Sequence, residues 1–123
     1  MNRDLEIENA LALLKQLSER LNLSFEYQDW GIINADSRRI REFIHCFEDN
    51  PDFTDAQKYD LFELVIASVN DALEEGIVWI DDWKLYKEFI WKYKDVYRSQ
   101  IDYWSSLPDT GEFPIAELLR DIE

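Results

Sequence analysis

The residues that most often build catalytic and metal sites are scarce in this sequence. It has one cysteine, Cys46, one histidine, His45, and three glycines among 123 residues. A single cysteine excludes an internal disulfide, which is typical of cytosolic proteins. Three glycines leave little room for a phosphate-binding loop, and no G-x-S-x-G, P-loop or G-x-G-x-x-G pattern is present. We therefore expect no enzymatic activity and no cofactor.

Long apolar runs are also missing. No apolar run approaches the roughly 20 residues of a membrane-spanning helix, and the opening stretch MNRDLEIENALALLKQL lacks the basic-then-apolar order of a signal peptide. Aromatic residues make up 15% of the chain, which excludes the disordered class because disordered chains are poor in aromatics. The length fits a single domain, residues 1–123, with its own core. We expect a cytoplasmic protein.

Basic residues are outnumbered throughout the chain. There are 13 Lys and Arg against 27 Asp and Glu, a net charge of −14. Residues 1–50 hold six basic and ten acidic side chains, whereas residues 51–123 hold seven and seventeen. A field of this sign repels nucleic acids and anionic membranes and accelerates the encounter with a basic protein. We expect a basic protein partner, with no direct binding to nucleic acid or membrane.

Apolar residues recur with the 3.6-residue period of α-helices along most of the chain. A first helix is expected over residues 4–22. Its apolar face contains Ile7, Leu11, Leu14, Leu17 and Leu21. Residues 22–36 lack this period and predict an irregular connection, in which residues 25–27 could be extended. A second helix then runs to about Asp49, with Asp36 or Ser37 as its cap.

Local signals mark both ends of the third helix. Residues 54–57, Thr-Asp-Ala-Gln, match a capping box and predict a helix as far as Glu75. Gly76 fits the position after a helix C-terminus, where a positive φ is favoured.

A fourth helix is expected to begin at residues 82–83, with Asp81 as its cap. It continues to about residue 106 or breaks near residues 98–100. A second apolar row widens its buried face, which predicts a central helix. The row contains Leu85, Phe89, Val96 and Tyr103. Pro114 begins the last helix. The sequence thus predicts an all-α fold, a single-domain bundle of five or six helices.

Two patterns resemble metal sites only in part. Glu42 and His45 have the E-x-x-H spacing of di-iron bundles, but such a site needs two copies and the chain has one histidine. Residues 71–82, DALEEGIVWIDD, have glycine at the sixth position of a calcium loop, yet apolar residues stand at positions seven to ten. A surface histidine and a helix boundary explain these patterns better, so we expect no metal site.

Acidic residues gather on one side of the third helix. Asp60, Glu63, Asp71 and Glu74 align opposite its apolar face, and Leu64 falls on the same acidic side. Acids around a small apolar centre are typical of a protein interface.

The stretch EEGIVWIDDW, residues 74–83, continues this acidic side. Helix capping explains Asp81 and Asp82 better than an acid–base pair does. Glu74 and Glu75, in contrast, lie at a helix C-terminus, where negative charge is unfavourable. The neighbouring Trp79 is a large candidate anchor.

Two further features of the sequence, an isolated tryptophan and a group of arginines, do not belong to the acidic side of the third helix. Trp91 stands in the middle of the polar strip of the fourth helix. Arg38, Arg39 and Arg41 follow one another on the second helix, and we expect them to dock onto an acidic patch of this chain or of its partner. The predicted partner-binding residues are Glu63, Leu64, Asp71, Glu74, Glu75, Trp79, Asp81, Asp82 and Trp91.

The helix–bridge–helix DLFELVIASVNDALEEGIVWIDDWKLYKEFIWKYKDVY, residues 60–97, resembles the immunity proteins of bacterial toxin systems, such as contact-dependent growth inhibition and related polymorphic toxins. The resemblance is one of character: a small, acidic, glycine-poor helical chain with aromatics among its acids. It implies a non-catalytic protein that binds a cognate toxin domain, often a basic nuclease, and blocks its active site or substrate groove. The alternative is a helical structural or regulatory module that self-associates through an aromatic surface.

Overall fold

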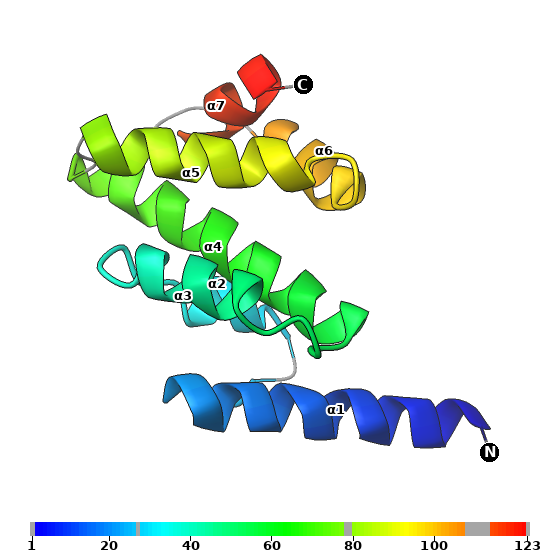
Figure 1. Cartoon of the computed structure of the whole chain (residues 1–123). Coiled ribbons are helices and arrows are strands. Elements are labelled where there is room, and N and C mark those ends of the chain that lie inside the picture. Colours follow the sequence, from blue (N-terminus) through cyan, green and yellow to red (C-terminus); the bar gives the residue numbers. More distant parts are fainter. Residues whose placement is uncertain (1, 27, 78–79, 108–113, 123) are drawn as a thin grey trace.

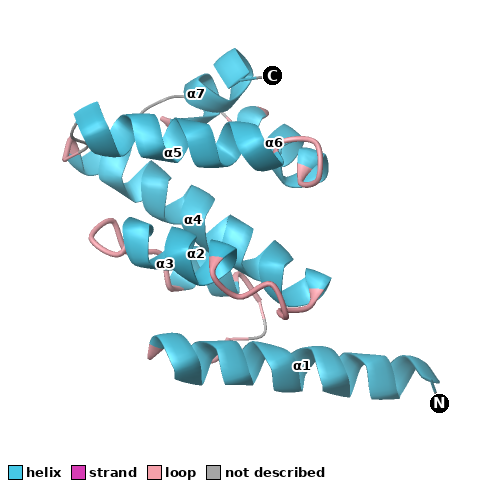
Figure 2. Cartoon of the chain, viewed as in Figure 1, coloured by secondary structure: helices cyan, strands magenta, loops and turns pink. Residues whose placement is uncertain are grey.

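Seven α-helices and no strands occur in the part of the chain that the computed structural model describes, residues 2–26, 28–77, 80–107 and 114–122 (Figures 1 and 2). The helices are α1 (Asn2–Leu21), α2 (Trp30–Ile33), α3 (Ile40–Glu48), α4 (Asp55–Glu75), α5 (Ile80–Tyr93), α6 (Arg98–Ser105) and α7 (Ile115–Ile122). The all-α prediction is confirmed, whereas the predicted number of five or six helices is too low. The unexpected helix is α2, which lies in the segment predicted to be an irregular connection. None of the described helices is both long and apolar enough to cross a membrane.

The long helix α4 is the centre of the fold. It packs against α1, α2, α3 and α7, and Figure 1 shows it running diagonally between α3 and α5. Its N-terminus carries the predicted capping box: the Thr54 hydroxyl accepts from the Gln57 N–H, and Gln57 Oε1 accepts from the Thr54 N–H. At its other end Gly76 has a φ of 69°. Both predicted boundaries are confirmed.

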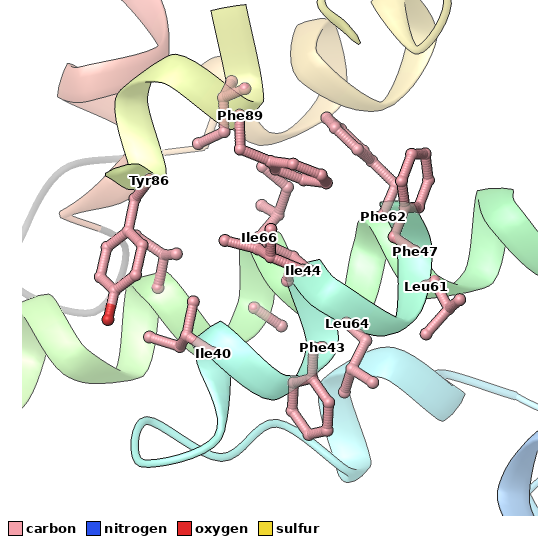
Figure 3. Close-up of a cluster of buried hydrophobic side chains, with 14 of the residues drawn as sticks. Ile40, Phe43, Ile44, Phe47, Leu61, Phe62, Leu64, Ile66, Tyr86 and Phe89 are labelled. Atoms are coloured by element: carbon pink, nitrogen blue, oxygen red, sulfur yellow. The ribbon is translucent and has the colours of Figure 1, made fainter. Parts of the chain in front are cut away.

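Aromatic rings join α4 to the helices on either side of it. Phe62 of α4 stacks on Tyr97, with ring centroids 4.5 Å apart, and also on Phe89 of α5 at 5.7 Å. Phe47 of α3 meets Phe89 edge-on at 5.2 Å. Figure 3 shows the buried side chains of α3, α4 and α5 gathered between these helices. Such pairs contribute roughly 0.5–1.5 kcal/mol each beyond area burial, so they help to fix the positions of α3 and α5 on α4.

Only the C-terminal half of α1 is packed. Leu14, Leu17 and Leu21 are buried, but Leu5 is 59% exposed and Ile7 is 51% exposed. Figure 1 shows that the N-terminal end of α1 projects beyond the N-terminal end of α4. The prediction that Ile7 belongs to the buried face is therefore wrong, because none of the described helices reaches far enough to cover it.

The short helix α2 packs between α1 and α4. Gly31 is buried, and a Cβ at this position would lie 2.9 Å from the backbone nitrogen of Leu64 in α4. The indole N–H of Trp30 donates to Ser18 Oγ at 2.8 Å, and the Ser18 hydroxyl donates to the Leu14 carbonyl. The absence of a side chain at Gly31 thus lets the α2 backbone approach α4, and α2 covers part of the face of α4 that the sequence predicted to be exposed.

The helices after α4 differ from the prediction at their ends. Helix α5 begins at Ile80, so Asp81 and Asp82 lie in its first turn and the prediction of Asp81 as the cap is wrong. The predicted break is present but comes earlier, between Tyr93 and Arg98. This break changes the rotational phase of the chain. Two residues of the predicted second row are therefore exposed, Val96 at 73% and Tyr103 at 58%.

Candidate functional site

A groove lies between α2, α4 and α6, and we call it the acidic groove. Two pockets that share Ile32, Tyr103 and Trp104 form it. The first pocket has a volume of about 400 Å³, and its further lining residues are Ala67, Asn70, Asp71, Glu74 and Leu107. The second has a volume of about 260 Å³, and its further lining residues are Asp29, Tyr59, Glu63, Ser99 and Gln100.

Carboxylates occur along the whole groove. Asp71 and Glu74 of α4 line the first pocket, and Glu63 of α4 and Asp29 before α2 line the second. Within the described residues, no Lys or Arg forms an ion pair with Asp29, Glu63 or Asp71. These three carboxylates therefore carry negative charge that no ion pair in this part of the chain neutralises.

Burial changes the acidity of these groups. It raises the pKa of Glu63, and the nearby charge of Asp29 raises it further. It also raises the pKa of Asp71, with smaller contributions from Glu75 and Asp36. Carboxylates that are desolvated and surrounded by like charge reduce stability when ionised. An external cation that binds among them would relieve this repulsion.

Asp60, one turn before Glu63 on α4, shows the largest change. Burial, together with the charge of Glu63, raises its pKa from 3.8 to about 6. The folded chain therefore binds more protons at this site than the unfolded chain does. The resulting stabilisation is fully present below pH 3.8 and is lost as the pH rises through about 6.

We expect Asp60→Asn to raise the free energy of unfolding at pH 7.5 by about 1–2 kcal/mol. The shift alone corresponds to about 3 kcal/mol at 1.36 kcal/mol per pKa unit, and solvent screening of this partly exposed group reduces it. The gain should shrink towards zero at pH 4, where the native carboxyl is already protonated. Urea unfolding at both pH values measures it. Asp102→Asn, an exposed control on α6, should show no pH-dependent gain, and an equal gain there would contradict the assignment.

Three of the predicted binding residues, Glu63, Asp71 and Glu74, line the acidic groove. Glu75 is exposed at the end of α4, where its carboxylate accepts a hydrogen bond of 2.9 Å from Ser37 Oγ. This contact gives Glu75 a structural partner that the sequence did not suggest.

The structure corrects the prediction that Leu64 is a partner-binding residue. Its side chain is 0% exposed, so it cannot belong to a surface that touches a partner. The helical period places Leu64 at the edge of the acidic side of α4. The α2 backbone at Gly31, however, packs directly against this point of the helix. A prediction from the helical period of α4 alone could not show that α2 covers Leu64.

The predicted residues after α4 lie apart from the acidic groove. Asp82 accepts from Arg41 Nε at 2.7 Å, and Asp81 is exposed. Trp91 is 57% exposed, and it lines a different pocket of about 590 Å³ that also contains Lys87. Trp79 lies outside the described residues.

The arginines of the second helix region contact carboxylates of this chain. Arg41 pairs with Asp82, as described above. Arg39 donates from Nε to a carboxylate oxygen of Glu42 at 2.9 Å. Arg39 and Arg41 thus each contact one carboxylate of this chain, and docking of the arginines onto an acidic patch stays a prediction. Asp82 is therefore less available to a partner than the acids of the groove.

The sequence did not indicate the α6 side of the groove. Tyr103 was expected in the core, and Gln100 carried no signal. Gln100 is only 3% exposed, its Nε2 donates to the Tyr59 carbonyl at 3.0 Å, and its Oε1 has no hydrogen-bond partner among the described residues. A buried acceptor left in this state costs roughly 1–3 kcal/mol. Native structures contain few such groups.

No group of three or more His, Cys, Asp and Glu side chains in the described residues is arranged to hold a metal ion. No protein-family model matches the chain, and no curated protein and no solved structure is similar enough to indicate a relative. The function is therefore inferred from the chemistry of the acidic groove.

Proposed function

We propose that this chain is a non-catalytic binding protein that neutralises a basic partner, a nuclease toxin domain, by direct binding through the acidic groove. The carboxylates of the groove would occupy the partner's site for phosphate groups and block its active site. One observation carries the proposal: Glu63 and Asp71 are partly buried in the groove, and no cation of the described chain pairs with them.

This arrangement reduces the stability of the free protein. Proteins commonly retain such local costs where function requires them. A basic partner would supply the missing positive charge and convert the repulsion into attraction. The net charge of −14 adds long-range steering, which increases association rates by about 10–10³-fold at low salt.

The groove also provides apolar contact area. Ile32, Tyr59 and Tyr103 are 44%, 46% and 58% exposed, and all three line the groove together with its carboxylates. Aromatic and aliphatic anchors surrounded by polar groups are typical of the residues that dominate binding energy. The acids would therefore govern the association rate, and the apolar residues would govern the lifetime of the complex.

The test reverses charge at two acids of the groove, Asp71 and Glu74, and at the adjacent Glu75 together, each to Lys. We expect association with the partner to slow about tenfold or more at low salt and its salt dependence to flatten. The partner would be the toxin domain of a large secreted protein encoded immediately upstream, and stopped-flow mixing over a salt series measures the rate.

The matched control changes Glu88, Asp95 and Asp102 to Lys. These exposed acids of α5, α6 and the turn between them are not among the groove residues, so the same change in net charge should slow association less. An association rate that is insensitive to the first variant, or equally sensitive to both, would contradict binding through the acidic groove.

A second candidate function rests on Trp91. Its exposed ring, with Lys94 Nζ 3.4 Å from the ring centroid, borders the 590 Å³ pocket. A helical structural or regulatory module could self-associate through this aromatic surface. Sedimentation of the isolated protein separates the two functions: a stable dimer that Trp91→Ala dissociates favours the module.

A further inference from the structure

A pocket of about 230 Å³ lies where the start of α3 meets the start of α5, and we call it the arginine pocket. Its lining residues are Ser37, Arg38, Ile40, Arg41, Ile77, Asp82 and Tyr86. It shares none of them with the acidic groove. This described lining holds two arginines and one acid, in a chain whose net charge is −14. The pocket is therefore basic relative to the rest of the molecule.

Arg38 contributes an unpaired positive charge to the pocket. The Oδ1 atom of Asp36 accepts from the Arg38 backbone N–H at 2.9 Å, which helps to hold the turn that carries this side chain. The guanidinium forms no ion pair and no hydrogen bond within the described residues. In this part of the chain its five N–H donors are therefore available to a ligand.

Arg41 is held at the wall of the pocket by Asp82. Its Nε donates to Asp82 Oδ1 at 2.7 Å, and its Nη2 donates to the same oxygen. The third nitrogen, Nη1, has no hydrogen-bond partner among the described residues. Asp82 thus orients the guanidinium of Arg41 and leaves one of its nitrogens for a ligand.

The Tyr86 hydroxyl is a third unpaired donor. The side chain is only 5% exposed, and no described residue forms a hydrogen bond with its hydroxyl. The oxygen keeps accessible surface, unlike Gln100 Oε1, so a ligand can reach it. Figure 3 shows it at the edge of the buried cluster, at the end of the ring away from Phe89. Burial raises the pKa of Tyr86, the charge of Asp82 raises it further and Arg41 lowers it, so the hydroxyl is a neutral donor near pH 7.

The arrangement of these donors indicates the class of ligand. Arg38 precedes α3, Arg41 lies in its first turn, and Tyr86 belongs to α5. A phosphoryl group has three terminal oxygens that point in different directions, whereas the two oxygens of a carboxylate lie in one plane. Arginine is also especially suited to phosphate oxygens. A volume of about 230 Å³ is below the roughly 300–1,000 Å³ of pockets for drug-sized ligands, which favours a small ion or a terminal group.

We propose that the arginine pocket binds a phosphoryl group, as free phosphate or as a phosphomonoester, through hydrogen bonds donated by Arg38, Arg41 and Tyr86. The site goes beyond the proposed function, because it is separate from the acidic groove and requires no toxin partner. The charge of Asp82 opposes the anion, so binding is weak and becomes tighter when that charge is removed.

The experiment titrates the full chain, labelled with ¹⁵N, with sodium phosphate at pH 7.5 and constant ionic strength. The Nε–H signals of Arg38 and Arg41 and the backbone amides of residues 37–41 are followed by NMR. We expect saturable shifts with a dissociation constant of about 1–20 mM, at least fivefold weaker binding of acetate, and no saturable shifts with chloride. Methyl phosphate separates the two sources: affinity equal to that of phosphate identifies a phosphomonoester, and binding of phosphate alone identifies the free ion.

Three variants test the assigned contacts. Arg38→Gln removes the unpaired charge and should weaken phosphate binding at least fivefold. Tyr86→Phe removes only the hydroxyl and should weaken it at least threefold. Asp82→Asn keeps an oxygen for Arg41 but removes the opposing charge, and it should strengthen binding at least threefold.

The matched control is Arg98→Gln, the same chemical change at an exposed arginine of α6 that is not in the lining. It should bind phosphate as the unchanged protein does. A loss equal to that of Arg38→Gln would mean that only the general charge matters, and this would overturn the site. Equal affinity for acetate, shifts that do not saturate, or unchanged phosphate binding in Arg38→Gln or Asp82→Asn would overturn it as well.

Discussion

Gly31→Val should lower the free energy of unfolding by about 3 kcal/mol or more, because overpacking at a rigid contact is among the largest single-residue effects. A Cβ on Gly31 would lie 2.9 Å from the Leu64 nitrogen and 3.1 Å from the Glu63 carbonyl carbon. Both atoms belong to the backbone of α4, which neighbouring helices hold in place, so they cannot move aside as a flexible side chain would. Urea unfolding followed by circular dichroism measures the loss.

Gly76→Ala is the control, because Gly76 is required for its backbone conformation and not for close packing. Gly76 has a positive φ of 69°, but a Cβ there meets nothing within 4 Å. Its replacement should cost only about 1 kcal/mol, the strain of a left-handed alanine. If Gly31→Val were no more destabilising than Gly76→Ala, the close approach of α2 to α4 would be wrong.

The position of α2 also matters for the acidic groove. Asp29 and Ile32, the neighbours of Trp30 and Gly31 in the chain, both line the groove. A side chain at residue 31 would push these residues away from Glu63. We therefore expect Gly31→Ala, where the variant folds, to slow association with the basic partner even though Gly31 itself does not line the groove.

The ends of α4 could be predicted because their signals are local. Thr54 and Gln57 are three residues apart and satisfy each other's backbone groups, whatever else packs around them. Gly76 likewise needs only the helix that precedes it. The helical period also placed Glu63, Asp71 and Glu74 on one face, and these three residues do line the groove.

The remaining parts of the site depend on contacts between distant segments. In a non-periodic stretch, Gly31 is indistinguishable from an ordinary loop glycine until the α4 backbone is placed beside it. Tyr103 is exposed because the chain breaks between α5 and α6, which changes the phase of its apolar row. Gln100 is recognisable only through burial and an unused acceptor. None of these properties is encoded in the spacing of nearby residues.

Leu64→Ala should reduce the free energy of unfolding by about 2–5 kcal/mol, since its fully buried side chain would leave a cavity in the centre of the fold. Leu5→Ala is the same chemical change on α1 at a site that is 59% exposed, and it should change stability by less than about 0.5 kcal/mol. Thermal or urea unfolding of both variants measures the difference.

The comparison of Leu64→Ala with Leu5→Ala also decides whether Leu64 is a surface anchor or a core residue. A surface anchor, as the period of α4 predicted, would lose partner affinity on truncation while stability stayed nearly constant. A core residue would lose stability, while the fraction that remains folded at low temperature would bind with nearly unchanged affinity because the groove carboxylates are intact. Stability within about 0.5 kcal/mol of the unchanged protein for Leu64→Ala would refute the burial of this side chain under α2. It would also return Leu64 to the binding surface.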